Sequence, residues 1–131
     1  MADELAQLRR NIDRFDTVVT AKLRGVAWRK SREVATIARR LAPRNNQMRG
    51  RLNEGEPHLA DSIVIDEDAK DRSFRVRPET PWNPNLGLWL EFGTSKMAAQ
   101  PFMRPAGDHV TASYRNEMIE AATAAADEAL R

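Results

Sequence analysis

The sequence contains no cysteine, so neither a disulfide framework nor a thiolate metal site can be built from it. It also lacks any run of about 18 apolar residues, which is the length that a membrane-spanning helix needs. The first ten residues do not show the basic stretch followed by an apolar stretch that marks a signal peptide. We therefore expect a chain that stays in the reducing compartment where it is made.

Groups for catalysis or metal binding are scarce as well. The two histidines, His58 and His109, have no second ligand at a metal-binding spacing, and no serine lies in a nucleophile elbow. The acidic triplet at residues 66–68 lacks the alternating oxygen ligands of a calcium loop and is typical of a turn. We therefore expect no enzymatic activity, no metal ion and no cofactor.

Charge is distributed unevenly along the chain. Residues 1–60 hold 13 Lys or Arg against 7 Asp or Glu, whereas residues 61–131 hold 8 against 12. Between Lys22 and Arg51 there are ten basic residues and only one acidic residue, Glu33. This region could attract phosphates or an acidic protein face, or its charges could simply be solvated on a helix.

A long apolar stripe begins near the N-terminus. Its members recur mostly three or four positions apart, which predicts one helix over residues 3–41 that Pro43 would end. They are Leu5, Leu8, Ile12, Phe15, Val19, Leu23, Val26, Val34, Ile37 and Leu41. At 1.5 Å per residue such a helix would be roughly 55 Å long, more than a small globule covers. Either the helix bends at Gly25 or part of the stripe faces another subunit.

The remaining chain predicts an α+β fold. Residues 42–61 are rich in proline, glycine and asparagine and are typical of a long surface loop, and two short alternating runs, "SIVID" and "SFRVRPE", predict a hairpin. The run "LWLEFG" predicts a third strand, and residues 104–130 predict a second long helix. We expect one domain over residues 1–131, in which the C-terminal helix packs on one face of an antiparallel sheet of about three strands.

One short segment, "EFGTSKMAAQPFMRPAGD" at residues 91–108, has the composition of a contact element. Gly93 allows a backbone turn that other residues disfavour, and Pro101 stiffens the exit from it. Phe92 and Phe102 are candidate apolar anchors for a partner. The alternative is that both rings fill the core of the chain itself.

The longer run "LWLEFGTSKMAAQPFMRPA", residues 88–106, resembles the signature of a family of small tail-component proteins of long-tailed double-stranded DNA bacteriophages. Members combine Glu-Phe-Gly-Thr, a short Lys-containing loop, and Gln-Pro-Phe followed by a basic residue, Pro and Ala. The positions that we expect at a subunit or ring interface are Glu91, Phe92, Gly93, Thr94, Lys96, Pro101, Phe102 and Arg104. The chain departs from the family at residues 44–61, where it carries an insertion.

The resemblance implies a structural role in the virion, with assembly in the host cytoplasm. It implies a tail completion, terminator or head-to-tail joining subunit, which forms a hexamer-like ring of identical copies around the DNA channel. The expected partners are further copies, the tail tube, the head-connector proteins and, nonspecifically, passing DNA. Candidate phosphate contacts in the loop are Arg44, Arg49 and Arg51. The alternative function is a small DNA-binding regulatory protein with a basic loop.

Overall fold

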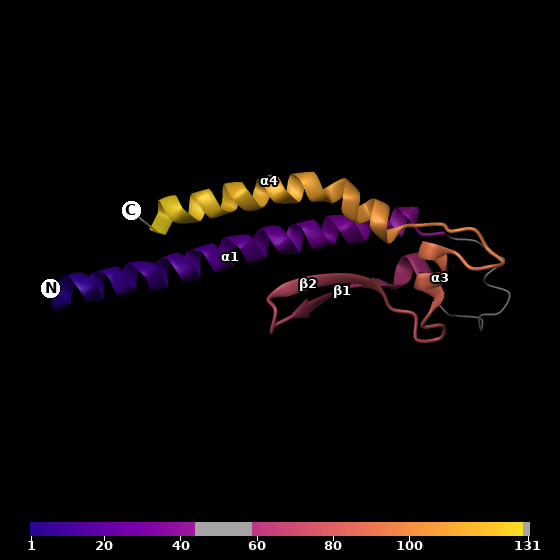
Figure 1. The fold of residues 1–131 in the computed structure, drawn as a ribbon, viewed down its shortest axis with the longest axis horizontal. Helices are drawn as coiled ribbons and strands as arrows, with labels where there is room; N and C mark the ends of the chain where they lie inside the picture. The colour runs from indigo at the N-terminus through magenta and orange to yellow at the C-terminus, as the bar shows by residue number, and fades with distance from the viewer. Residues whose placement is uncertain (44–58, 130–131) are drawn as a thin grey trace. The chain divides into compact units, whose positions relative to one another are not determined.

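The computed structural model describes residues 1–43 and 59–129. A long helix, α1 (Ala2–Leu41), comes first, and a short 3-10 helix, η1 (Leu59–Ser62), leads into strands β1 (Ile63–Asp68) and β2 (Ser73–Pro78). A short helix, α3 (Leu86–Phe92), and a second long helix, α4 (Met103–Ala129), follow (Figure 1). The expected α+β class, both long helices and the hairpin are thus confirmed. None of the described helices is long and apolar enough to cross a membrane.

Helix α1 has the ends that its sequence predicts. Asp3 and Glu4 lie in its first turn and Arg39 and Arg40 in its last turn, where each charge is favourable beside the helix dipole. The helix continues through Gly25, so it is not interrupted at the point where we considered a bend. Most of the predicted loop that follows, residues 44–58, lies outside the described residues.

The chain divides into two compact units. One consists of Met1–Lys30 and Ala112–Arg131, and the other of Ser31–Thr111. Each long helix therefore contributes one part to each unit. The assignment of residues 1–131 to a single domain stays a prediction.

The first unit pairs the N-terminal part of α1 with the C-terminal part of α4. The two helices run antiparallel, because Lys22 forms an ion pair with Glu128 at 3.2 Å whereas Arg29 reaches Glu117 at 3.5 Å. Lys30 forms a further ion pair with Glu117. Small side chains such as Ala125 are fully buried there, as expected where alanines allow close approach of helices.

The second unit has a core to which both helical and strand segments contribute. The last turns of α1, η1, β1, α3 and the start of α4 supply its members, with the ring of Phe102 as its largest fully buried side chain. The buried members are Ala35, Ala38, Ala42, Leu59, Ala60, Ile63, Leu86, Leu90, Phe102 and Ala106. The fully buried members from α1 are alanines, so the large fully buried side chains come from the later elements, while Val34 and Ile37 of α1 pack against the core at its edge.

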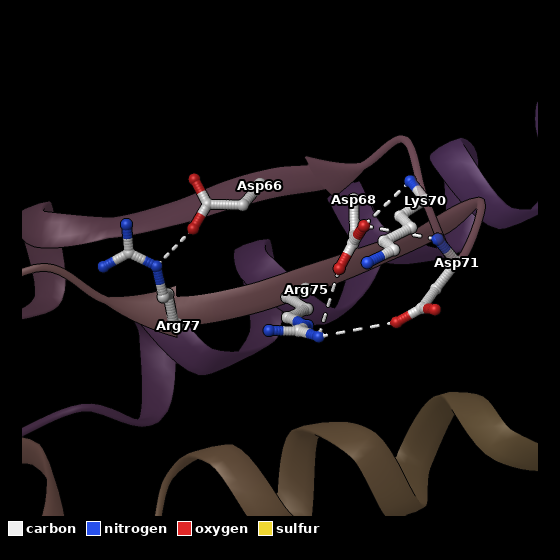
Figure 2. Close-up of polar contacts among 6 residues, drawn as sticks. All are labelled: Asp66, Asp68, Lys70, Asp71, Arg75 and Arg77. Atoms are coloured by element: carbon white, nitrogen blue, oxygen red, sulfur yellow. Dashed lines mark hydrogen bonds and ion pairs between the residues drawn. The ribbon is translucent and has the colours of Figure 1, made fainter.

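The hairpin has one apolar and one charged face. Ile65 pairs with Val76 and both pack against the core, while the next residues along each strand point the other way. On the charged face Arg77 forms an ion pair with Asp66, and Arg75 contacts Asp68 at 3.3 Å (Figure 2).

The acidic triplet forms the end of β1, so the expected turn position is wrong for Asp66 and Glu67, and only Asp68 adjoins the turn. The turn interpretation is confirmed for Asp68, whose Oδ1 accepts hydrogen bonds from two backbone amides of the turn. In the described part of the chain no cluster of acidic or histidine side chains could hold a metal ion. The triplet therefore has a local structural role in the hairpin.

The predicted third strand is wrong, because residues 86–92 form helix α3 and the described sheet has two strands. Leu86 and Leu90 are one helical turn apart and both are buried, so one side of the helix faces the core. The run contains no β-branched residue to favour a strand. Gly87 is needed at the contact with β2, since a Cβ there would lie 2.7 Å from Pro78 Cγ.

Candidate functional site

The segment from α3 to the start of α4 is organised around one carboxylate. Glu91, at the end of α3, accepts hydrogen bonds on Oε2 from the backbone amides of Phe102 and Met103, both at 3.0 Å. Its Oε1 accepts a third from the amide of Arg104 at 2.9 Å. These are amides at the start of α4, which have no partner within the helix. Glu91 thus caps a helix that begins more than ten residues after it in the sequence.

The environment of Glu91 favours the charged carboxylate. Burial by itself would raise its pKa, but the amides of Phe102, Arg104 and Met103, together with the charge of Arg104, outweigh burial. The pKa of Glu91 therefore lies below its ordinary value. The positive end of the α4 dipole acts in the same direction.

The turn after α3 is closed by backbone hydrogen bonds. Gly93 has a φ of +76° and donates to the carbonyl of Trp89 at 2.7 Å. Thr94 and Met97 exchange hydrogen bonds of 2.9 and 3.3 Å. A Cβ on residue 93 would lie 2.8 Å from the backbone nitrogen of Ala99 and 2.9 Å from the Met97 carbonyl. Only glycine fits this backbone closely.

The two phenylalanines of residues 91–108 differ in burial. Phe102 is 0% exposed and lies in the core, whereas Phe92 is 72% exposed. Leu88 and Trp89 on the same helix are 61% and 42% exposed. We call these three exposed side chains of α3, Leu88, Trp89 and Phe92, the apolar rim. Leu88 and Phe92 are one helical turn apart, so they share one side of the helix.

A comparison with known proteins gives no relative. No family model, no curated protein and no solved structure matches this chain. The similarity of residues 88–106 to phage tail components therefore stays a hypothesis that rests on the sequence motif.

The eight predicted interface residues differ in their exposure to solvent. Exposed positions are Phe92, Thr94, Lys96, Pro101 and Arg104. Glu91 and Gly93 are partly buried and hold the segment together, and the ring of Phe102 belongs to the core. The surface offered to a partner is therefore made by the exposed members together with the apolar rim.

The three candidate phosphate contacts, Arg44, Arg49 and Arg51, lie outside the described residues. Several basic side chains that precede them in α1 are engaged within the chain. Lys22 and Arg29 pair with acidic side chains of α4, and Arg39 donates to the carbonyl of Ile63 at 2.8 Å. These contacts account for part of the basic run between Lys22 and Arg51.

Sequence reasoning did not identify Leu88 as exposed, nor the capping role of Glu91. The reason is that residues 88–93 were expected to form a strand, in which neither feature arises. The spacing of Leu86 and Leu90, four apart on a run without β-branched residues, was the available signal for a helix with an exposed opposite side.

Replacing Glu91 should weaken the fold in a pH-dependent way. Glu91→Gln is expected to lower the free energy of unfolding by about 1–3 kcal/mol at neutral pH, since one of its two acceptor oxygens is lost. The folded-state pKa is depressed, so the carboxylate stabilises the fold above the unfolded-state pKa, and this is lost as the pH falls through the lower folded-state pKa. Urea unfolding should show a gap between variant and wild type that shrinks below about pH 4.

The matched control for this experiment is Glu120→Gln, at an exposed position of α4. It removes the same charge without removing a helix cap, so its unfolding curve should follow that of the wild type. A Glu91→Gln gap that stays constant down to low pH would contradict the capping role.

The turn glycine should be irreplaceable, in contrast to a helical glycine nearby. Gly93→Ala is expected to lower the free energy of unfolding by about 2 kcal/mol, because it combines a strained φ with contacts to backbone atoms. Gly107→Ala, in α4 with nothing within 4 Å of the new Cβ, should raise it by about 0.5–1 kcal/mol. Thermal and urea unfolding of both variants measure this, and equal effects of the two substitutions would refute the turn geometry.

Proposed function

We propose that the chain is a structural virion protein, a tail completion, terminator or head-to-tail joining subunit that forms a ring of identical copies around the DNA channel. One observation carries this proposal. The segment that resembles the tail-component family, residues 88–106, is internally braced by Glu91 and Gly93 and presents the apolar rim to solvent.

The apolar rim has the properties of an assembly contact. Trp89, Leu88 and Phe92 are large apolar side chains gathered on one short helix, and such gatherings mark interaction sites more often than isolated exposed residues do. Aromatic side chains supply much of the binding energy at protein interfaces. The exposed Lys96 and Arg104 add polar groups from the adjoining segment.

The bracing matters for assembly because it lowers the entropy that is lost on binding. Hydrogen bonds close the turn from Gly93 to Gln100, so the segment does not need to be ordered when a partner arrives. When identical copies bind through two different surfaces, they form a closed ring if the rotation from one copy to the next is a whole fraction of a full turn. The hexamer-like number, the tail tube and the head-connector proteins as neighbours follow from the resemblance.

The mechanism that we propose is assembly and not catalysis, with no cofactor. Passing DNA would be contacted nonspecifically by Arg44, Arg49 and Arg51, because DNA must slide through a channel. A DNA-binding regulator with the same basic loop is the alternative, and it differs in requiring preference for a sequence.

Two phenylalanines of the motif should behave oppositely in an assembly assay. Phe92→Ala is expected to weaken self-association by about 2 kcal/mol, or roughly 30-fold, and to leave the unfolding free energy within about 0.5 kcal/mol of wild type. Phe102→Ala should instead lower the unfolding free energy by about 3–5 kcal/mol, since its ring is fully buried. Sedimentation over a range of concentrations and urea unfolding give the two quantities.

The control for the assembly assay is Ile119→Ala, because Ile119 is an exposed apolar residue of α4 outside the motif. It should assemble like wild type. If Phe92→Ala and Ile119→Ala assemble equally well, the apolar rim is not the ring contact.

DNA binding should be salt-sensitive and indifferent to sequence. We expect two unrelated duplexes to bind equally in fluorescence anisotropy titrations, with affinity that falls as salt rises. Replacing Arg44, Arg49 and Arg51 by Gln should reduce the slope of log K against log salt by up to about 0.9 for each phosphate that the variant no longer neutralises. A preference for one duplex that survives moderate salt would favour the regulator instead.

A further inference from the structure

The first four turns of α1 carry an apolar stripe that the first unit leaves uncovered. Helix α4 is described as far as Ala129, and its Glu128 is the residue that reaches Lys22 by an ion pair and, through its carbonyl, Arg14. Helix α1 continues beyond the end of α4 toward its own N-terminus (Figure 1). The apolar side chains of this stripe are all exposed: Leu5 at 64%, Leu8 at 55%, Ile12 at 58% and Phe15 at 40%. We call these four residues the N-terminal stripe.

The N-terminal stripe continues an interface that already exists in the chain. Its spacings of three, four and three residues are those of a heptad repeat, with Leu5 and Ile12 at a positions and Leu8 and Phe15 at d positions. The next a position after Val19 is Val26, which is buried in the unit that α1 forms with α4. One side of α1 is therefore covered by α4 along its later part and is exposed before it.

The apolar side of this part of α1 is exposed along its length. Fourteen residues from Ala2 to Phe15 make up this part of α1. They extend a helix that is already formed, but most of the stability of a helix in a protein comes from the packing of its amphipathic face. Their capping charges, Asp3 and Glu4, contribute only tenths of a kcal/mol each. A partner that matches the spacing of the stripe would supply this packing.

We propose that this partner is the same segment of a second copy, in a parallel, in-register two-helix coil. In such a coil a g residue faces the e residue five positions later on the other helix. Glu4 is at g and Arg9 at e, so each copy would place Glu4 beside Arg9 of the other, twice per dimer. The next g and e positions are Asn11 and Asp16, which hydrogen-bond without repulsion. The segment is complementary to itself in charge as well as in spacing.

The antiparallel arrangement that would bury the same four side chains fits less well. Leu5 would then face Phe15, and Leu8 would face Ile12 of the other copy. In this register the e positions bring Arg9 next to Arg9 of the second copy, which is a like-charge contact. The parallel arrangement replaces that repulsion with two attractive pairs.

This contact goes beyond the ring proposed above and does not depend on it. A parallel pair of identical segments is a two-fold contact, so it closes on two copies and cannot by itself extend around a ring. It also uses α1, whereas the proposed ring contact uses α3. The two proposals therefore fail separately, since Phe92→Ala tests one and substitutions in the N-terminal stripe test the other.

The absence of cysteine allows a direct test in the full chain. In the parallel coil, residue 8 of one copy lies against residue 8 of the other, so Leu8→Cys should form a disulfide-linked dimer on mild oxidation. Arg10→Cys is the control, because position 10 is an f position on the opposite side of the helix and should stay largely unlinked. Linkage at both positions to the same extent, or at neither, would overturn the proposal. Linkage only when Leu8→Cys and Ile12→Cys chains are mixed would overturn it in favour of the antiparallel pair.

A charge-reversal cycle tests the register independently. Arg9→Glu should weaken the dimer at least about tenfold in sedimentation experiments, because Glu4 would then face a glutamate. Adding Glu4→Arg should restore it to the wild-type level. Ile12→Glu, an exposed substitution that leaves the folded unit intact by circular dichroism, should abolish the dimer. An unchanged dimer in Arg9→Glu, or no recovery in the double variant, would reject the parallel pairing.

Discussion

The second unit depends on the carboxylate of Glu91 lying against the first amides of α4. Those amides have no acceptor within the helix, and the residue that satisfies three of them is at the end of another helix. The bonds determine where α4 begins relative to α3 and close the chain between them into a loop. Because Leu90 precedes Glu91 and Phe102 donates to it, the same bonds bring two of the largest buried side chains into one core.

Helix α3 has one buried and one exposed side. Leu86 and Leu90 are committed to the core, so the residues on the other side of the helix, Leu88 and Phe92, are left in solvent. The turn after α3 must then reverse close to the Met97 carbonyl and the Ala99 amide, which is why a glycine occupies position 93. The exposure of Leu88 and Phe92 in the apolar rim thus follows from the burial of the opposite side of α3.

Electrostatics in the first unit gives a physical meaning to the uneven charge of the sequence. Three basic residues of α1 pair with two acidic residues of α4: Lys22 with Glu128, and Lys30 and Arg29 together with Glu117. The hydrogen bond from Lys30 is the main reason that the pKa of Glu117 lies below its ordinary value. Part of the positive field that the sequence suggests for polyanions is therefore used to pair two helices.

Patterns of short range were readable from the sequence. The three-and-four spacing over residues 3–41 determined α1, the alternation around Val76 determined the hairpin faces, and the acidic turn at Asp68 followed from local side-chain chemistry. Only the tertiary structure decided that residues 86–92 are helical, that Phe102 is inside while Phe92 is outside, and that Glu91 is a cap. Those outcomes depend on hydrogen bonds and burial between residues far apart in the chain, and two phenylalanines of equal hydrophobicity carry no local signal of which one the fold will enclose.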